Sequence, residues 1–157
     1  MGEAILNSVK HFNLSEELLI KIDKSESSIQ ALVYLLNEGA DINYQAEQDG
    51  YTPLMLAVDQ DNELIVTFLL EQGANPLIKN HYNEIASDIA LCYSPIYQLL
   101  KNNELLFAAL INDINCCKDA LFSGANINYQ GVGGYTAEMI SKEQNHLGLL
   151  SVLRSFK

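Results

Sequence analysis

The chain has 157 residues, 48% of them hydrophobic, and a formal net charge of -11 from 20 acidic and 9 basic residues. This length and hydrophobicity are enough for a folded core, so a globular domain is expected rather than a disordered tail. The negative charge disfavours nucleic-acid binding and anionic membrane surfaces, and it is compatible with a protein partner that carries a basic patch. Solubility alone explains the same charge equally well.

Cysteine content points to a reducing environment. Cys92, Cys116 and Cys117 are odd in number, two are adjacent, and the sequence contains no Cys-x-x-Cys. That pattern disfavours a disulfide framework or a structural zinc site and favours a cytoplasmic location. The N-terminus has no basic segment followed by a long apolar one, so no signal peptide is predicted. The longest apolar run, residues 105–111, is too short to cross a bilayer.

The first predicted repeat unit covers residues 15–43. Its second helix closes with the stretch YLLNEGAD, which contains Gly39. It lacks a Thr-Pro-Leu opening and carries charge on its outer side, as expected of a terminal capping unit. Residues 2–13 predict a further helix or helical turn packed against it.

The second unit begins at Gly50 with GYTPLMLAV. Thr52 can cap a helix with its hydroxyl group, and Pro53 suits the first helical position because it needs no amide partner. The polar stretch 59–62 ends this short apolar helix. A second helix follows over 63–72 and ends at Gly73, which can adopt positive φ.

The later units are more degenerate. Residues 83–90 predict an inner helix, and the second helix that follows is expected to stop near Asn103. Residues 104–128 predict another full helix pair around Gly124, and a last unit runs from Gly134 to the C-terminus. Ala90 and Ala108 occupy equivalent positions but are only 18 positions apart, so about half a period is missing there. The missing part is the extended loop, or finger, between the third and fourth units.

The stretch Thr52-Pro53-Leu54-Met55-Leu56-Ala57 resembles the Thr-Pro-Leu-His-x-Ala signature of ankyrin repeats, with Met55 in the place of histidine. Gly73-Ala74-Asn75 resembles the motif that closes such a repeat. The resemblance covers residues from about 15 to 157. It implies an all-α solenoid of about five helix pairs with degenerate ends, forming a single domain over residues 1–157.

This resemblance also implies a non-enzymatic function, namely binding of another protein through the finger tips and the exposed side of the inner helices. Tyrosine suits such surfaces because it offers a large contact area at low entropic cost. Tyr44 and Tyr129 are interpreted instead as packing between neighbouring fingers. The residues expected to contact the partner are Tyr51, Met55, Asp59, Tyr82, Asp88 and Tyr135.

Other chemistry is disfavoured. Cys116 and Cys117 align with Ile65 and Val66 of the second unit, so core packing is favoured over a redox or nucleophilic role. The three histidines are scattered, and the acidic stretch 59–63 lacks the glycine and distal glutamate of a calcium loop. No catalytic residue, metal site or cofactor is therefore expected.

Several roles remain open. The Asn, Ile and Lys residues together with the irregular repeats indicate a bacterial protein. Such a protein could be a secreted effector that engages host proteins or an inhibitor that neutralises a cognate toxin or effector. A thiol-based enzyme or redox sensor using Cys92 or the Cys116–Cys117 pair is the rival class, and a structural scaffold is the third. The leading hypothesis is a monomeric protein that binds another protein.

Overall fold

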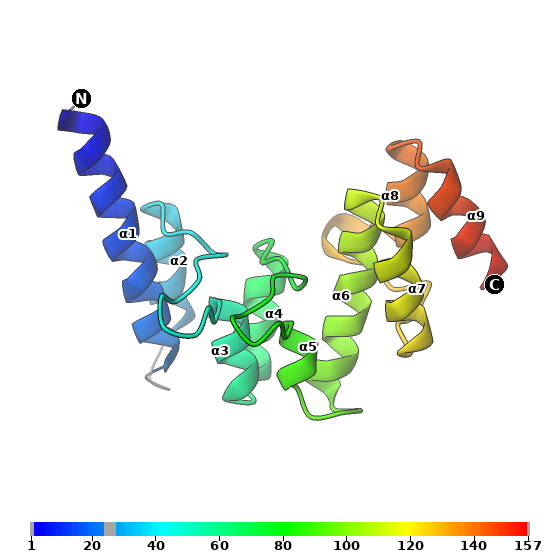
Figure 1. Ribbon diagram of the computed structural model, residues 1–157, viewed down its shortest axis with the longest axis horizontal. Helices are drawn as coiled ribbons and strands as arrows, with labels where there is room; N and C mark the ends of the chain where they lie inside the picture. The colour runs from blue at the N-terminus through cyan, green and yellow to red at the C-terminus, as the bar shows by residue number, and fades with distance from the viewer. Residues whose placement is uncertain (1, 24–27, 157) are drawn as a thin grey trace. The chain divides into compact units, whose positions relative to one another are not determined.

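The computed structural model describes residues 2–23 and 28–156, with side chains described for 9, 10, 13–23 and 28–156 (Figure 1). Over these ranges all regular structure is helical, which confirms the predicted all-α fold. The α-helices are α1 (Gly2–Asp23), α2 (Ile29–Asn37), α3 (Pro53–Asp59), α4 (Glu63–Glu71), α5 (Ala86–Ile89), α6 (Pro95–Ile111), α7 (Ile114–Phe122), α8 (Ala137–Glu143) and α9 (Leu147–Ser155). A 3-10 turn, η1, covers Val132–Gly134.

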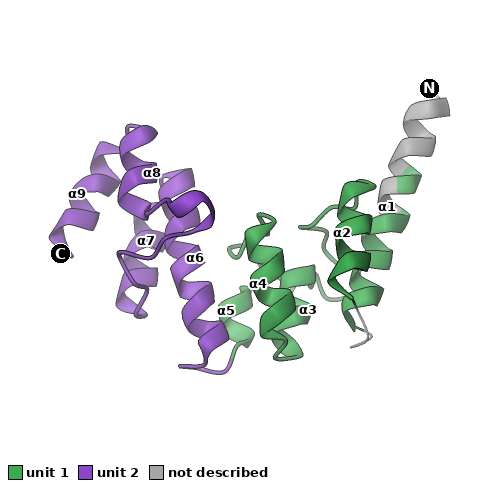
Figure 2. Ribbon diagram, turned by 180° about the vertical axis from the view of Figure 1, so that it is seen from behind, with its two compact units in different colours: residues 1–90 green, residues 91–157 purple. Residues whose placement is uncertain are grey.

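The chain divides into two compact units, Met1–Ala90 and Leu91–Lys157 (Figure 2). In the first unit, α1 contacts α2 and α3, and α3 contacts α4 and α5. In the second unit, α6 contacts α7 and α8, while α9 contacts α7 and α8. Each unit therefore stacks antiparallel helix pairs, so that one pair buries the apolar face of the next.

Side-chain caps fix where most of the helices begin. Thr52 accepts a hydrogen bond from the Met55 N–H, and Pro53 occupies the start of α3 as predicted. The side chains of Asn62, Ser94, Asp113 and Thr136 cap their helices in the same way. Because these groups satisfy amides that have no partner inside the helix, the helix starts are set locally.

Helix α1 is longer than predicted. The sequence predicts a further helix or helical turn over 2–13 beside a repeat that begins near residue 15, but Gly2–Asp23 form one continuous helix. No glycine or proline interrupts residues 3–23, so nothing in the local sequence ends the helix.

The predicted end of the second helix of the third repeat, near Asn103, is also wrong, because α6 continues without a break from Pro95 to Ile111. The finger between the third and fourth repeats is absent, as predicted, and the two helices that it would separate are fused into α6. Lys101 and Glu104 lie in the middle of α6, are buried, and form an ion pair with Nζ and Oε2 2.9 Å apart. The fusion therefore buries a polar segment that a loop would expose to water.

Asn102 takes over a contact that the missing finger would make. In the first unit, the Asn75 N–H donates to Asn43 Oδ1 at 2.8 Å, which links the base of one finger to the next. In the second unit, the Asn126 N–H donates to Asn102 Oδ1 at 2.7 Å. The Asn102 side chain on α6 thus makes the contact to Asn126 that a residue of a preceding finger would otherwise make.

Candidate functional site

Two successive fingers of the first unit form the frame of the candidate site: the first finger is the loop between α2 and α3 (residues 38–52), and the second finger is the loop between α4 and α5 (residues 72–85). The first finger closes through the Ala46 N–H, which donates to the Tyr51 carbonyl at 2.9 Å. Its Gly50 has a φ of +75°, and a Cβ at that position would lie 2.7 Å from the His81 ring. Only glycine fits both the conformation and this close approach.

The second finger is bonded to the first. The His81 N–H donates to the Asp49 carbonyl at 2.8 Å, and Gln45 Nε2 donates to the carbonyls of Lys79 and Gly50. Asn80 is buried and shapes the tip, because its Oδ1 accepts from two backbone amides of the same finger. These hydrogen bonds join the two fingers into one platform.

Three of the residues predicted to contact a partner lie on this platform or beside it, at the end of α3. The pKa of Tyr51 is raised, first by burial and then by the negative charges of Asp59, Glu84 and Asp49, with a smaller effect from Tyr82. Tyr82 is 69% exposed, and Asp59 is exposed at the end of α3. Tyr51, Asp59 and Tyr82 thus share one electrostatic neighbourhood at the surface.

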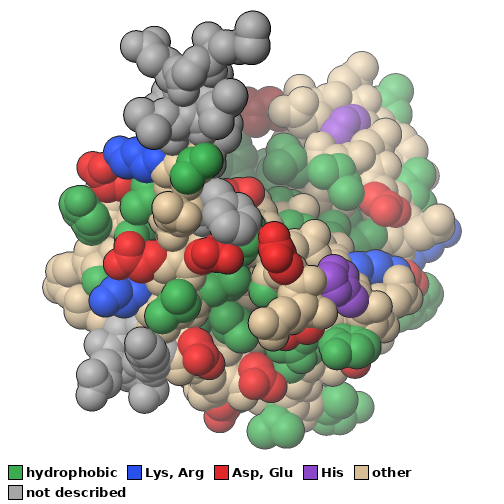
Figure 3. Space-filling model, turned by 60° about the vertical axis from the view of Figure 1, so that its left-hand side comes forward, with side chains coloured by type: hydrophobic (Ala, Val, Ile, Leu, Met, Phe, Trp, Pro, Cys, Tyr) green, Lys and Arg blue, Asp and Glu red, His purple; other side chains and the backbone are tan. Residues whose placement is uncertain are grey.

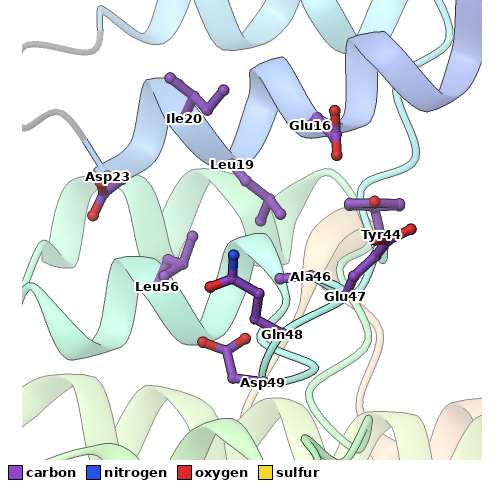
Figure 4. Close-up of a pocket in the computed structure, with 10 residues that line it drawn as sticks. All are labelled: Glu16, Leu19, Ile20, Asp23, Tyr44, Ala46, Glu47, Gln48, Asp49 and Leu56. Carbon is purple, nitrogen blue, oxygen red and sulfur yellow. The ribbon is translucent and has the colours of Figure 1, made fainter.

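A groove of about 490 Å³ lies beside this cluster, between α1, the first finger and α3 (Figure 4). Its carboxylates come from two elements, and Leu19 points from α1 into the space above the finger. The lining residues are Glu16, Leu19, Ile20, Asp23, Tyr44, Ala46, Glu47, Gln48, Asp49 and Leu56. In the face of the molecule that Figure 3 shows, acidic side chains border hydrophobic ones.

Tyr44 lies at the end of the groove that Glu16 and Glu47 approach. Burial, followed by the charges of these two carboxylates, raises its pKa. The interpretation of Tyr44 as a spacer between fingers therefore misses its place in the groove lining. A cationic group in the groove would meet carboxylates and aromatic surface together, an arrangement that suits a Lys or Arg side chain.

Met55 was expected to contact a partner, but its side chain is only 1% exposed. Helix α3 contacts α1, α4 and α5, so five of its seven residues are buried. Met55 points toward these neighbours and fills the core. The prediction that Met55 contacts a partner is wrong, because the signature position that it occupies serves helix packing.

The other two predicted residues are Asp88 and Tyr135. Asp88 is exposed, and its Oδ2 accepts a hydrogen bond from the Ile85 N–H at 2.9 Å, which caps α5. Tyr135 belongs to the second unit, where it is 44% exposed and its ring approaches Gly133. Its role as a partner contact stays a prediction.

The α1 residues of the groove were not identified from the sequence. Glu16, Leu19, Ile20 and Asp23 follow the i, i+3, i+4, i+7 spacing that places side chains on one helix face. That spacing was the available signal. Only the position of the first finger shows that this face lines a groove.

The cysteines are unpaired in the structure. Cys117 is buried and Cys116 half-buried, which agrees with their predicted core positions. Burial, with nearby acidic residues including Glu104 and Asp113, raises the pKa of Cys116 to about 11, and burial with Asp113 does the same for Cys117. At neutral pH both thiols are protonated and therefore poor nucleophiles.

Within the described residues, no three His, Cys, Asp or Glu side chains gather closely enough to hold a metal ion. None of the helices described here has the length and apolar character needed to span a bilayer.

Comparisons with known proteins match residues 7–80 to the family described as "Ankyrin repeats (3 copies)". The chain is 42% identical over 62 residues to the human 2-5A-dependent ribonuclease, covering 40% of this chain and 8% of that protein. It is 36% identical over 84 residues to the I-Kappa-B like protein G2 of Microplitis demolitor bracovirus, covering 51% and 50%. It is 29% identical over 140 residues to the putative ankyrin repeat protein FPV018 of Fowlpox virus, covering 81% and 19%.

The chain thus spans half or less of the length of these relatives. They come from a vertebrate and from viruses, and they give no support to the predicted bacterial origin.

Proposed function

We propose that the chain, of which residues 7–80 match ankyrin repeats, is a non-enzymatic module that binds a protein with a basic surface through the first unit. Ankyrin repeats generally mediate interactions between proteins. The observation that supports this proposal is the groove between α1, the first finger and α3, which combines carboxylates with apolar side chains. The neighbouring Tyr51, Asp59 and Tyr82 extend the proposed contact surface along the fingers.

Charge makes a basic partner the favoured one. The protein has an excess of 11 acidic over basic residues, and the groove lining contains four carboxylates and no basic side chain. Such a surface attracts a positively charged partner at long range and raises the association rate at low salt. The aliphatic part of a Lys or Arg side chain would contact Leu19, Ile20 and Leu56, while its charged end would reach the carboxylates.

The test uses charge reversal with a matched control. Glu16→Lys with Asp59→Lys changes two exposed acids at the proposed surface, and Asp119→Lys with Glu143→Lys changes two exposed acids in the second unit. Partners captured by the wild-type protein are identified by mass spectrometry, purified and titrated against each variant. We expect affinity to fall by at least about tenfold in the first variant and by much less in the control.

Equal losses in both variants would show that only net charge matters and would reject the groove as the binding site. The proposal also predicts that the affinity of the wild-type protein falls as NaCl is raised, because exposed charges more than about 10 Å apart are screened at 0.1 M salt.

The finer roles follow from the partner. A secreted effector and an inhibitor of a cognate toxin both require a bound protein, and the identity of the captured partner separates them. We also propose that residues 1–157 act as a monomeric single domain in a reducing cytoplasmic compartment, which suits the three unpaired cysteines. Light scattering at the monomer mass and one cooperative unfolding transition are the expected results.

A further inference from the structure

The residues of α1 that line the groove form one row along the helix. Glu16, Leu19, Ile20 and Asp23 are spaced i, i+3, i+4 and i+7, which places them on one helix face. Glu16 and Asp23 are separated by about two helical turns, or about 10.5 Å along the axis. The row therefore has a carboxylate at each end and two apolar side chains between them (Figure 4).

The opposite wall of the groove adds further acidic and apolar surface. After burial, the charges of Glu16 and Glu47 raise the pKa of Tyr44, so both carboxylates lie beside the same phenol ring. Leu56 of α3 lines the groove on the side opposite α1. The groove thus combines a strongly negative end at Tyr44 with apolar surface about one helical turn further along α1.

We propose that the groove binds an amphipathic helix with two Lys or Arg residues seven positions apart and two apolar residues, three and four positions after the first. This inference rests on the proposed function, because it names the segment that the basic partner presents. A helix laid along α1 has the same rise per residue, so its basic residues at i and i+7 reach Glu16 and Asp23 together. Its apolar residues at i+3 and i+4 then pack on Leu19, Ile20 and Leu56. The pattern is the same in both directions, so the helix can lie parallel or antiparallel to α1.

An extended segment fits the groove less well. Side chains on one face of a strand recur at every second residue, about 6.7 Å apart, so none lies about 10.5 Å from the first. An extended backbone also needs hydrogen-bond partners, and the first unit has no strand among its described residues that would pair with it. A helix bonds its own backbone and needs only side-chain contacts from the groove.

A second copy of the chain does not offer this segment. None of the nine Lys and Arg residues in the sequence lies seven positions from another. The expected occupant is therefore a different protein, whose positive charge complements the carboxylates that line the groove.

Three synthetic peptides of equal charge, titrated by calorimetry into the full 157-residue chain, test the proposal. The first is an alanine-rich peptide of about 20 residues, long enough to form a helix, with Lys at i and i+7 and Leu at i+3 and i+4. The second has both leucines moved two positions along, onto the opposite helix face. The third is the first peptide with proline at i+5, which breaks the helix. We expect the first to bind at least about tenfold more tightly than the other two.

Matched variants of the protein locate the contact. Glu16→Gln and Glu17→Gln remove the same charge at adjacent exposed positions, of which Glu16 lines the groove and Glu17 does not. Ile20→Ser and Leu64→Ser each remove an apolar side chain that is at least half exposed, so both proteins should stay folded. We expect Glu16→Gln and Ile20→Ser to weaken binding of the first peptide by at least about fivefold, and the two controls by less than about twofold.

Several results would overturn the proposal. Equal affinity for the first and second peptides would show that charge alone determines binding, and equal affinity for the first and third would replace the helix by an extended segment. Equal losses in Glu16→Gln and Glu17→Gln would place the contact outside the groove. Self-association of the wild-type protein that disappears in Glu16→Gln, measured by sedimentation, would assign the groove to a second copy.

Failure of this inference is separable from failure of the proposed function. If no peptide binds while the Glu16→Lys and Asp59→Lys variant still loses its captured partner, the groove binds a basic protein and the helix is rejected. If that variant also keeps its partner, both proposals are wrong.

Discussion

Gly50 shows how strongly one residue can constrain the candidate site. Its positive φ bends the first finger, and its missing side chain lets the His81 backbone come close enough to bond Asp49. The two fingers can form their platform only if both conditions are met.

Gly50→Ala should therefore lower the free energy of unfolding by more than about 2 kcal/mol, since an added Cβ meets both an unfavourable φ and the His81 backbone at 2.9 Å. Gly73→Ala is the matched control, because Gly73 also has positive φ but a Cβ there would meet nothing within 4 Å. Urea unfolding measures both variants. Equal losses would show that the close approach contributes nothing.

The thiols allow a test of the pKa values at the residue scale. Since the pKa of Cys116 and Cys117 is about 11, labelling with iodoacetamide at pH 8 should modify exposed Cys92 first and leave the other two nearly unreacted. Mass spectrometry of tryptic peptides gives each rate. Fast labelling of Cys116 at pH 8 in the folded protein would revive the thiol-enzyme hypothesis.

The raised pKa of Cys116 and Cys117 also makes the stability of the fold depend on pH. A raised pKa in the folded state means that the folded protein holds these thiol protons more tightly than the unfolded chain does. The associated stability is present below pH 9, the ordinary thiol value, and is lost as pH rises toward about 11. Urea midpoints between pH 8 and pH 11 should fall more steeply for the wild-type protein than for Cys117→Ala.

At the scale of elements, α6 shows how the fold accommodates a missing finger. Asn102 Oδ1 accepts the Asn126 N–H and also the Gln98 Nε2, 3.2 Å away, and Gln98 in turn donates to the Gly124 carbonyl. Two side chains one helical turn apart on α6 thus make the contacts that a preceding finger would otherwise make.

Asn102→Ala should cost about 1 to 3 kcal/mol of folding free energy, because the Asn126 amide loses its acceptor in a part-buried site. Asn115→Ala on α7, where the side chain is exposed, is the control and should change stability by less than about 0.5 kcal/mol. Chemical denaturation of both variants tests the difference, and similar values for the two would remove the assigned role of Asn102.

The last helix pair, α8 and α9, exposes charged residues on a face that is apolar and buried in the pair α3 and α4. Residues 137–155 align with 53–71, so Glu138, Lys142 and Arg154 occupy the places of Leu54, Val58 and Leu70. The three apolar residues are buried, whereas Lys142 and Arg154 are exposed and Arg154 lies 3.8 Å from Glu138. Hydration thus replaces helix packing on this face of α8 and α9.

At the scale of the whole molecule, the dominant property is the net charge of -11. Like charges within one folded chain repel, which destabilises the compact state until salt screens them. The melting temperature should therefore rise by a few degrees between 0.05 and 0.5 M NaCl, as measured by scanning calorimetry. The Asp119→Lys and Glu143→Lys variant carries less negative charge and should show a smaller rise. A salt response as large as that of the wild-type protein would contradict this account.

Local signals determined the helix pairs, most of the helix starts and the absence of one finger, because caps, helical periodicity and glycine positions act over a few residues. Only the tertiary structure decided which side chains are accessible. Met55 is buried because α3 contacts other helices, and Tyr44 lines a groove because α1 passes beside the first finger. Exposure depends on neighbours from distant parts of the chain, so residues in equivalent repeat positions can face the core in one helix pair and solvent in another.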